Sequence, residues 1–288
     1  MPFAMIGFVL GLYHPGMKIY NLNSTIEWGN RFVDIFMFLH LDILIFVILC
    51  MITARSAAMA FNRYLDRSFD AKNPRTAIRE IPAGVISAKS ALTFTILCCV
   101  TFVVSCYFIN SKVLMLSPIA LFVILFYSYT KRFTALCHLV LGLGLSLAPL
   151  GAYLAVTAQF NVLPIVFSLI VLFWVSGFDI IYALQDETFD KENKLHSIPA
   201  MLGKSKALNV SRLLHFICAS IVFFVGFYYH FHILYNIGAA TFVTMLYYQH
   251  SIVRPNDLSK VNIAFMTANG IASIVFAGFV IADIITNN

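Results

Sequence analysis

The sequence predicts an all-α protein that crosses a membrane many times. Of its 288 residues, 60% are hydrophobic and only 11% are charged, and the mean hydropathy is +0.86. A soluble domain is about half apolar and about a quarter charged. A water-soluble globule of this length cannot bury so much apolar surface, so lipid must cover most of it. No polar or low-complexity linker interrupts the chain, which predicts a single transmembrane domain over residues 1–288.

The apolar residues fall into nine segments. A helix needs about 20 residues to cross the hydrocarbon of a bilayer. The last eight segments reach that length or nearly so, and we interpret each as a spanning helix. The first segment is too short, which predicts that this helix is incomplete in the sequence as it stands. The segments are roughly 1–13, 43–62, 89–109, 113–130, 134–157, 162–182, 211–230, 232–250 and 261–282.

The basic residues predict the orientation. Of the 19 Lys and Arg, 15 lie in loops that follow the second, fourth, sixth and eighth segments. Cytoplasmic loops carry the excess of Lys and Arg, so these loops are predicted to be cytoplasmic, with the N-terminus inside and the C-terminus outside. The net charge of +6 reflects this asymmetry and gives no reason to expect a nucleic-acid partner. The 15 residues are Arg63, Arg67, Lys72, Arg75, Arg79, Lys89, Lys131, Arg132, Lys191, Lys194, Lys204, Lys206, Arg212, Arg254 and Lys260.

The cysteines and histidines show no metal pattern. All six cysteines lie in apolar segments without Cys-x-x-Cys spacing, which favours buried side chains over disulfides or zinc ligands. Among the eight histidines, only His138 closely follows a basic loop, that of Lys131 and Arg132. In the stretch 14–42, aromatic and aliphatic residues at helical spacing predict a helix along the membrane interface.

One short phrase occurs twice. NRYLDRSFDAKNPRTAIREIPAG covers residues 62–84, and DIIYALQDETFDKENKLHSIPAMLG covers residues 179–203. Each phrase has Asp-x-x-Phe-Asp beside an apolar segment, then charged residues, then Ile-Pro-Ala. The two copies lie 120 residues apart on the same predicted side of the membrane. This predicts two parallel pseudo-repeats, about 1–133 and 134–288.

The acidic residues of each phrase share one helical face. With about 100° per residue, the side chains in each phrase span an arc of about 80°. Arg55 lies on the face of the first phrase, within the span. The residues that share a face are Asn62, Asp66 and Asp70 in the first phrase, and Asp179, Tyr182, Asp186 and Asp190 in the second.

These acids are interpreted as more than solvated loop charges. The two phrases contain eight of the 13 acidic residues, and the spacing of four is held twice. Asp179 and Arg55 also lie inside apolar segments, where an ionised side chain costs about 2.5–3.5 kcal/mol.

Together the charges predict a diphosphate site. Several carboxylates that face one cavity cannot all stay ionised without cations, and Mg²⁺ combines a few carboxylates with substrate phosphates. The interleaved basic residues can bind a polyanion. A diphosphate site at the mouth of a membrane bundle predicts a substrate with an oily tail, such as a polyprenyl diphosphate. The site would promote loss of the diphosphate and attack on the allylic carbocation by an electron-rich acceptor.

The motifs resemble those of the UbiA superfamily of intramembrane prenyltransferases. Three elements match in order: Asn-x-x-x-Asp-x-x-x-Asp from Asn62, Asp-x-x-Tyr-x-x-x-Asp-x-x-x-Asp from Asp179, and Tyr-x-x-x-Lys at Tyr127 and Lys131. The resemblance covers about residues 50–280. It implies nine helices around a central cavity with a cytoplasmic cap, and two Mg²⁺ ions bridged by the diphosphate of the substrate.

The resemblance also implies roles for individual residues. Tyr127 and Tyr182 would position the prenyl group or stabilise positive charge. They would act in catalysis together with four of the motif aspartates, which are Asp66, Asp70, Asp186 and Asp190. The implied metal ligands are Asn62, Asp66, Asp70, Asp179, Asp186 and Asp190, and the implied diphosphate ligands are Arg75, Arg79, Lys131, Lys191 and Lys194.

The amino-acid sequences of the two phrases are most similar to those of the bacterial branch described as 4-hydroxybenzoate polyprenyltransferase-like. That branch includes the futalosine route to menaquinone, so the acceptor would be 4-hydroxybenzoate or a dihydroxynaphthoate, in ubiquinone or menaquinone biosynthesis. The implied location is the bacterial inner membrane, with the site facing the cytoplasm, membrane lipid around it and no obligate protein partner. A different class, a transporter or cation channel that uses the intramembrane charges, stays open at this point.

Overall fold

The computed structural model describes residues 2–13 and 40–287, and the stretch predicted to lie along the interface falls largely outside them. Within these ranges the chain forms helices and no strands. The long helices are α1 (Pro2–Leu12), α3 (Leu41–Asp70), α4 (Ala88–Ile109), α5 (Ser111–Thr130), α6 (Cys137–Thr157), α7 (Val162–Ala183), α10 (Lys204–Tyr228), α11 (Ile233–Ile252) and α12 (Asn269–Asn287). The short ones are the 3₁₀ turn η1 (Leu184–Asp186), α8 (Glu187–Glu192), α9 (Ile198–Leu202) and the π-helical turn η2 (Ile263–Ala268) before α12.

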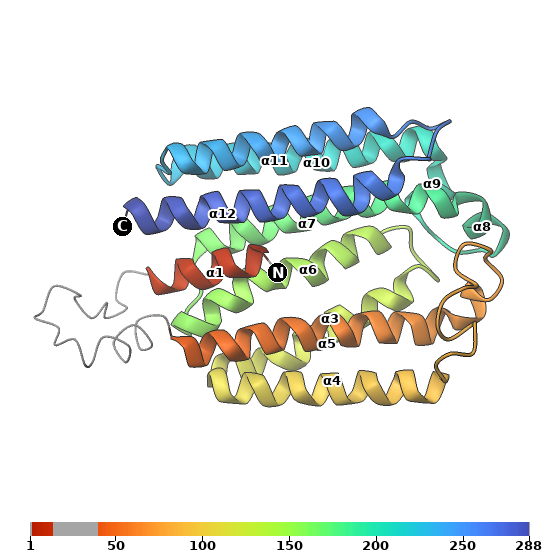
Figure 1. The fold of residues 1–288 in the computed structure, drawn as a ribbon, viewed down its shortest axis with the longest axis horizontal. Coiled ribbons are helices and arrows are strands. Elements are labelled where there is room, and N and C mark those ends of the chain that lie inside the picture. The colour runs from red at the N-terminus through yellow and green to blue at the C-terminus, as the bar shows by residue number, and fades with distance from the viewer. Residues whose placement is uncertain (1, 14–39, 288) are drawn as a thin grey trace, which may run out of the picture.

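The long helices run side by side as a bundle, and α8, α9 and the loop after α3 gather at one end (Figure 1). Each predicted apolar segment overlaps one helix of the bundle. Seven helices in the described ranges are long and apolar enough to cross a membrane. The all-helical membrane class is therefore confirmed, whereas nine spans stay a prediction. The two helices outside the seven are α1, which has 11 residues, and α11, which contains Asn236, Gln249 and His250.

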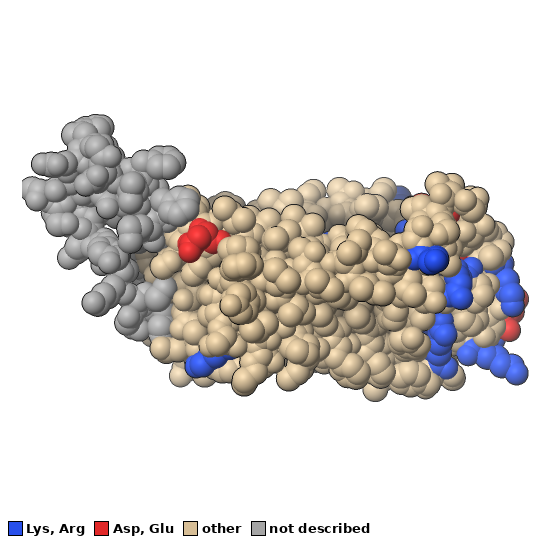
Figure 2. Space-filling model, turned by 90° about the horizontal axis from the view of Figure 1, so that it is seen from below, with Lys and Arg blue, Asp and Glu red and all other residues tan. Residues whose placement is uncertain are grey.

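The charged side chains are segregated along the bundle. On the face shown in Figure 2, Lys and Arg gather at the end that carries α8 and α9, and few charged side chains lie between the two ends. This is the arrangement expected when the middle of the bundle lies in hydrocarbon.

The helix that carries the first acidic phrase extends beyond its apolar segment. That segment was expected to end near residue 62, and α3 continues to Asp70. Asn62, Asp66 and Asp70 therefore lie on one helix face, as their spacing predicts. The second phrase behaves differently, because α7 ends at Ala183 and is followed by η1 and α8. The helical run thus continues through Asp190, but the 3₁₀ turn interrupts its regular α-helical spacing. The tight 3₁₀ turn places Asp186 and Asp190 on separate short elements, where cations from different loops meet them.

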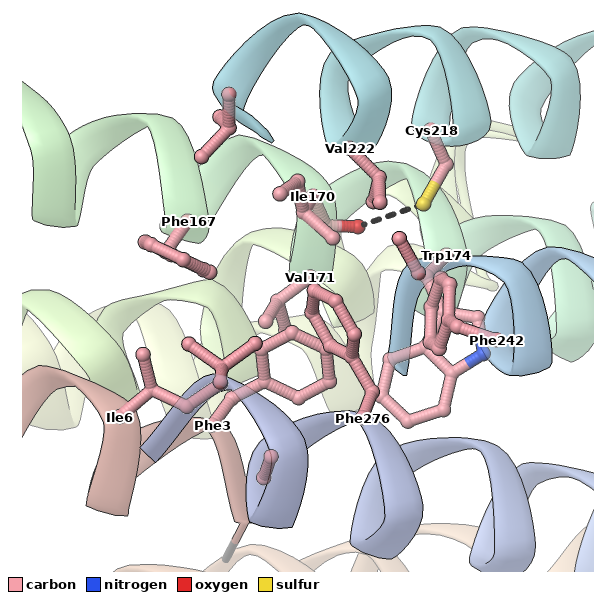
Figure 3. Packing of buried hydrophobic residues seen from close by; sticks show 14 of the residues in the cluster. Phe3, Ile6, Phe167, Ile170, Val171, Trp174, Cys218, Val222, Phe242 and Phe276 are labelled. Atoms are coloured by element: carbon pink, nitrogen blue, oxygen red, sulfur yellow. Dashed lines mark hydrogen bonds between the residues drawn. The ribbon is translucent and has the colours of Figure 1, made fainter. Parts of the chain in front are cut away.

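The largest core joins the N-terminal helix to the second half of the chain. Phe3 and Ile6 of α1 pack against Phe167 and Trp174 of α7 and against Phe276 of α12 (Figure 3). These side chains are almost fully buried. Truncating a buried aromatic to Ala typically costs about 3–5 kcal/mol. The fold of the second half therefore depends on α1, although α1 is too short to be identified from its sequence as a span.

Close approach of helices depends on two glycines. A Cβ at Gly7 would collide with the backbone of Pro149, where α1 meets α6. At Gly142 it would collide with Ser176 and the Leu172 carbonyl, where α6 meets α7. Small residues allow such contacts in membranes, where packing rather than the hydrophobic effect holds helices together.

An acid in the apolar part of α12 has a structural partner. Asp283 is 1% exposed, and its carboxylate accepts the backbone N–H groups of His232 at 2.9 Å and Tyr235 at 3.2 Å. These groups begin α11, whose first N–H donors have no partner within their own helix. A carboxylate there also interacts favourably with the helix dipole. Asp283 thus caps α11 from a neighbouring helix.

We expect Asp283→Ala to lower the thermal stability of the purified protein, by about 2 kcal/mol or more, because hydrogen bonds to a buried carboxylate are lost. Fluorescence-detected thermal unfolding in detergent measures the shift. Asp257→Ala, at an exposed acid in the loop after α11, is the control. Its carboxylate accepts only local hydrogen bonds from Ser259, so this variant should shift the midpoint much less. Equal midpoints for both variants would contradict the cap.

Candidate active site

The two acidic phrases and the Tyr127–Thr134 stretch meet at the charged end of the bundle. The first phrase ends α3 and forms the loop to α4, and the second spans the end of α7, η1, α8 and α9. The basic loop after α5 lies between them. Its position is fixed by the His196 N–H, which donates to the Lys131 carbonyl at 2.7 Å. Regions far apart in the chain therefore form one site.

The first phrase presents three polar side chains on α3. The Asn62 amide donates to Asp66 at 3.1 Å, which fixes the amide and leaves its carbonyl oxygen as an acceptor. The second carboxylate oxygen of Asp66 lies 3.6 Å from Arg132. Asp70 is buried and accepts two contacts from Arg79, at 2.7 and 2.9 Å.

The second phrase is held by residues from the first half of the chain. Arg75 binds both carboxylate oxygens of Asp186, at 3.0 and 2.5 Å, and donates to the Tyr182 hydroxyl at 3.0 Å. Asp190 is fully buried, and its carboxylate lies 2.8 Å from the Lys131 ammonium. The Ser197 hydroxyl donates to the other oxygen of Asp190 at 2.8 Å.

Four of the five motif aspartates therefore each pair with a separate Lys or Arg. Two of these pairs, Asp186 with Arg75 and Asp190 with Lys131, join the two halves of the chain. The consecutive residues Lys131 and Arg132 contact different phrases. The predicted convergence of the two acidic phrases is thus present in the structure. The pairs are Asp66 with Arg132, Asp70 with Arg79, Asp186 with Arg75, and Asp190 with Lys131.

The central cations stay charged despite partial burial. Burial lowers the pKa of Lys131, but the carboxylates of Asp190 and Asp186 outweigh this, and the pKa lies above its usual value. The pKa of Arg75 is likewise raised, because the hydrogen bond and charge of Asp186 outweigh burial. The site therefore retains its donors of positive charge across the physiological pH range.

Asp179 and Tyr127 lie next to these pairs. The Asp179 carboxylate accepts from His138 Nδ1 at 2.7 Å. The Ile198 N–H lies 3.3 Å from His138 Nε2, so both ring nitrogens have a partner and the ring is held in place. Tyr127 lies within electrostatic range of Asp179, Asp66 and Arg79.

Other predicted residues lie outside this array. Lys191 pairs with Glu187 at 2.6 Å and is exposed. Lys194 is exposed with φ 56°, and no contact joins it to an acid among the described residues. Arg55, expected on the polar face of α3, is exposed in the middle of the helix. The structure brings Arg75, Arg79 and Lys131 to the motif aspartates. Lys191, Lys194 and Arg55 lie apart from those aspartates.

Three supporting residues, Asn73, Ser197 and His138, were not among the predicted site residues. Asn73 is buried, donates to Asp186 at 3.1 Å and accepts the Arg75 N–H at 3.0 Å. Ser197 caps α9 while it binds Asp190. His138 was singled out only by its position after the basic loop. Asn73 precedes Pro74, and Asn-Pro marks a turn. Ser197 stands before Ile-Pro at a helix start, a pattern typical of an N-cap.

The UbiA prenyltransferase family model matches residues 33–271, which is most of the chain. The chain belongs to the UbiA prenyltransferase family. It is 30% identical over 245 residues to the 4-hydroxybenzoate octaprenyltransferase of Nitrosomonas europaea, a match that covers 83% of this chain and 82% of the relative. It is 28% identical over 244 residues to the enzyme of the same name from Nitrosospira multiformis, covering 84% of this chain and 83% of the relative.

Solved structures share the fold. A UbiA homolog from Aeropyrum pernix K1 superposes with a TM-score of 0.77 at 23% identity, covering 99% of this chain and 95% of that one. A UbiA homolog from Archaeoglobus fulgidus, solved with GPP and Mg²⁺, gives 0.68 at 18% identity, covering 98% and 95%. Family membership confirms the predicted class of enzyme, a prenyltransferase, in place of a transporter or channel.

We expect Asn73→Ala to lower kcat/KM for the prenyl diphosphate about tenfold, since loss of one hydrogen bond to a buried carboxylate costs about 1.5–3 kcal/mol. Arg75 and Asp186 would lose their common support. Steady-state assays in membranes measure the change. Ile78→Ala, at a highly exposed side chain of the same loop, is the control. If both variants retain full activity, Asn73 does not position the pair.

Proposed function

We propose that the protein transfers a polyprenyl group from a polyprenyl diphosphate to an aromatic acid in quinone biosynthesis. The observation that carries this proposal is the array of four carboxylates, each paired with a separate cation, at the mouth of an apolar bundle. The relatives named 4-hydroxybenzoate octaprenyltransferase favour 4-hydroxybenzoate as acceptor over a dihydroxynaphthoate.

The donor set fits Mg²⁺. Carboxylates and the Asn62 amide carbonyl are hard oxygen ligands, and Mg²⁺ uses a few of these together with substrate phosphates. No cluster of three His, Cys, Asp or Glu within the described ranges is arranged around a common metal position. The contacts give the reason, because Asp66, Asp70, Asp186 and Asp190 each face a Lys or Arg. Asn62, Asp66 and Asp70 would hold one ion, and Asp186 and Asp190, with Asp179 nearby, a second. Bound Mg²⁺ would draw negative charge from the leaving diphosphate.

The basic residues supply the other half of the site. A diphosphate offers anionic oxygens to Arg75, Arg79 and Lys131, in place of the carboxylates they now contact. Guanidinium groups bind such oxygens in pairs, and Lys adds a point charge. These three residues would orient the diphosphate and stabilise the charge that develops as the allylic C–O bond breaks. Lys191 and Lys194, at the exposed rim, would assist only at entry.

Aromatic side chains lead from the charged site into the bundle. The Tyr182 ring lies 4.2 Å from Phe265, Phe265 lies 5.5 Å from Phe178, and Phe178 lies 5.2 Å from Trp174, between ring centres. Phe265 belongs to the π-helical turn η2, a type of turn found often at functional sites. This row would exclude water and line the path of the prenyl chain. Tyr127 and Tyr182, at its charged end, would stabilise the allylic cation until the acceptor ring attacks and a new C–C bond forms.

We further propose nine spans in two parallel pseudo-repeats within a single domain. The loop after α3, with α8 and α9, would form a cap on the cytoplasmic side of the inner membrane. The gathering of basic side chains at that end supports this orientation.

We expect Asp66→Ala and Asp186→Ala each to lower Mg²⁺-dependent transfer about 100-fold or more, because each removes a carboxylate from the charged array. Membranes containing each variant are incubated with radiolabelled farnesyl diphosphate and 4-hydroxybenzoate, and the product is identified by mass. Asp257→Ala is the control. Near-full activity of both motif variants in folded protein would remove these residues from the site.

The acceptor is tested with the same membranes. We expect prenylated 4-hydroxybenzoate to form at a higher rate than the dihydroxynaphthoate product when the two acids compete at equal concentration. A product formed only from the naphthoate would assign the enzyme to menaquinone synthesis and would contradict the preferred acceptor.

A further inference from the structure

A buried polar network lies beside the aromatic row that leads from the charged site into the bundle. Its centre is Asn269, which is 7% exposed. Asn269 Oδ1 accepts hydrogen bonds from Trp174 Nε1 at 3.0 Å and from Gln249 Nε2 at 2.6 Å. Asn269 Nδ2 donates to the Phe265 carbonyl at 2.8 Å. One side chain thus connects α7, α11 and the turn η2 that precedes α12.

The partners fix the orientation of the Asn269 amide. An indole N–H only donates, so the atom that faces Trp174 is the amide oxygen, and Gln249 must turn its NH₂ group toward the same oxygen. Gln249 Oε1 is then buried without a hydrogen-bond partner among the described residues. Exchanging both partners of a buried hydrogen bond for apolar groups of the same shape can be nearly neutral for stability. The contribution of this network is therefore the fixed orientation of the groups that it joins.

Asn269 supports the π-helical turn that carries Phe265. In an α-helix, the backbone N–H of Asn269 would donate to the Phe265 carbonyl, four residues earlier. Here this N–H donates to the Met266 carbonyl, and the Asn269 side chain binds the Phe265 carbonyl in its place. The side chain therefore stabilises the irregular backbone of η2. This backbone places the Phe265 ring against Tyr182, with 4.2 Å between ring centres, at the charged end of the row.

The same side chain holds the inner end of the row. Trp174 is fixed through its Nε1, and its ring lies 5.2 Å from that of Phe178, between ring centres. Around Trp174 the bundle is filled by the buried aromatic core (Figure 3). Toward the charged site, Phe178, Phe265 and Tyr182 are only partly buried. A ligand can therefore lie against these rings, whereas Asn269 is buried and acts only through them.

We propose that Asn269 is a positioning residue for the prenyl chain of the donor, a role that rests on the proposed path of the chain along this row. It holds Phe265 at one end and Trp174 at the other, and so keeps the rings in place over roughly 12 Å of α7. Rings that are already ordered bind the chain more tightly, because binding does not have to immobilise them. The diphosphate and the reacting carbon stay with the charged site, which Asn269 does not contact.

Kinetics with two ligands test this role. Asn269→Leu removes both hydrogen-bonding groups at similar size. We expect it to raise KM for farnesyl diphosphate about tenfold and to change kcat less than about threefold, because binding of the chain is what is lost. Inorganic diphosphate with Mg²⁺ has no chain, so its inhibition constant should stay unchanged. Ser273→Ala is the matched control. It removes a hydrogen bond at an equally buried residue one turn further along α12 and should change neither constant.

A second variant keeps the test valid if Asn269→Leu does not fold, which thermal unfolding shows. Trp174→Phe keeps an aromatic ring and removes the N–H that Asn269 accepts, and it should raise the same KM about threefold. Equal rises of KM and of the inhibition constant, or no change in the folded variants, would overturn the proposal. A wild-type protein that transfers no prenyl group would instead remove the proposed function on which this role rests.

Fluorescence follows the chain without turnover. The sequence has two tryptophans, so Trp28→Phe leaves Trp174 as the single one. With Mg²⁺ and without acceptor, we expect farnesyl diphosphate to change the emission of Trp174 and inorganic diphosphate to leave it unchanged. Adding Asn269→Leu to this background should reduce the response to farnesyl diphosphate. The same response to both ligands, or none to either, would show that the chain does not reach Trp174 and would overturn the proposal.

Discussion

The active site depends on the pairing of four buried or half-buried carboxylates with four cations. Removing one partner of a buried ion pair typically costs about 3–5 kcal/mol, because the remaining charge is left without compensation. Two of the pairs connect the two halves of the chain: Arg75 with Asp186, and Lys131 with Asp190. The charges that we propose to serve the reaction therefore also hold the two halves of the chain together. A substitution in the array is expected to affect assembly as well as catalysis, which is why folded protein must be verified for each variant.

Much of the fold follows from the sequence, because lipid is a simple solvent. An apolar run long enough to cross it forms a helix whose backbone groups are satisfied internally. The segments were located correctly on this ground, and the polar face of α3 followed from helical periodicity. The break in the second phrase did not follow. The segment from Asp179 to Asp190 contains no Pro or Gly, yet the regular α-helix ends at Ala183 and the chain continues as the 3₁₀ turn Leu184–Asp186.

For a related reason, the sequence could not predict which basic residue pairs with which aspartate. The sequence shows that acids and bases are interleaved, but several basic residues stand at similar distances from each acid along the chain. Lys191 follows Asp190 directly, yet Asp190 pairs with Lys131, and Lys191 pairs with Glu187 one turn away. Pairing across the bundle depends on where the loops pack. The backbone contact between His196 and Lys131 settles that packing, and no pattern of side chains predicts it.

On the proposed function, this pairing also couples the binding of metal and substrate. Mg²⁺ ions alone would compete for the carboxylates and leave Arg75, Arg79 and Lys131 as unpaired positive charges close to one another. A diphosphate alone would attract those cations and leave the carboxylates unpaired. If both ligands bound together, each carboxylate would gain Mg²⁺ as its new partner and each basic residue would gain a phosphate oxygen. No charge in the site would then be left uncompensated. The array can therefore remain closed and neutralised without substrate, and exchange partners only when a complete magnesium diphosphate head group arrives.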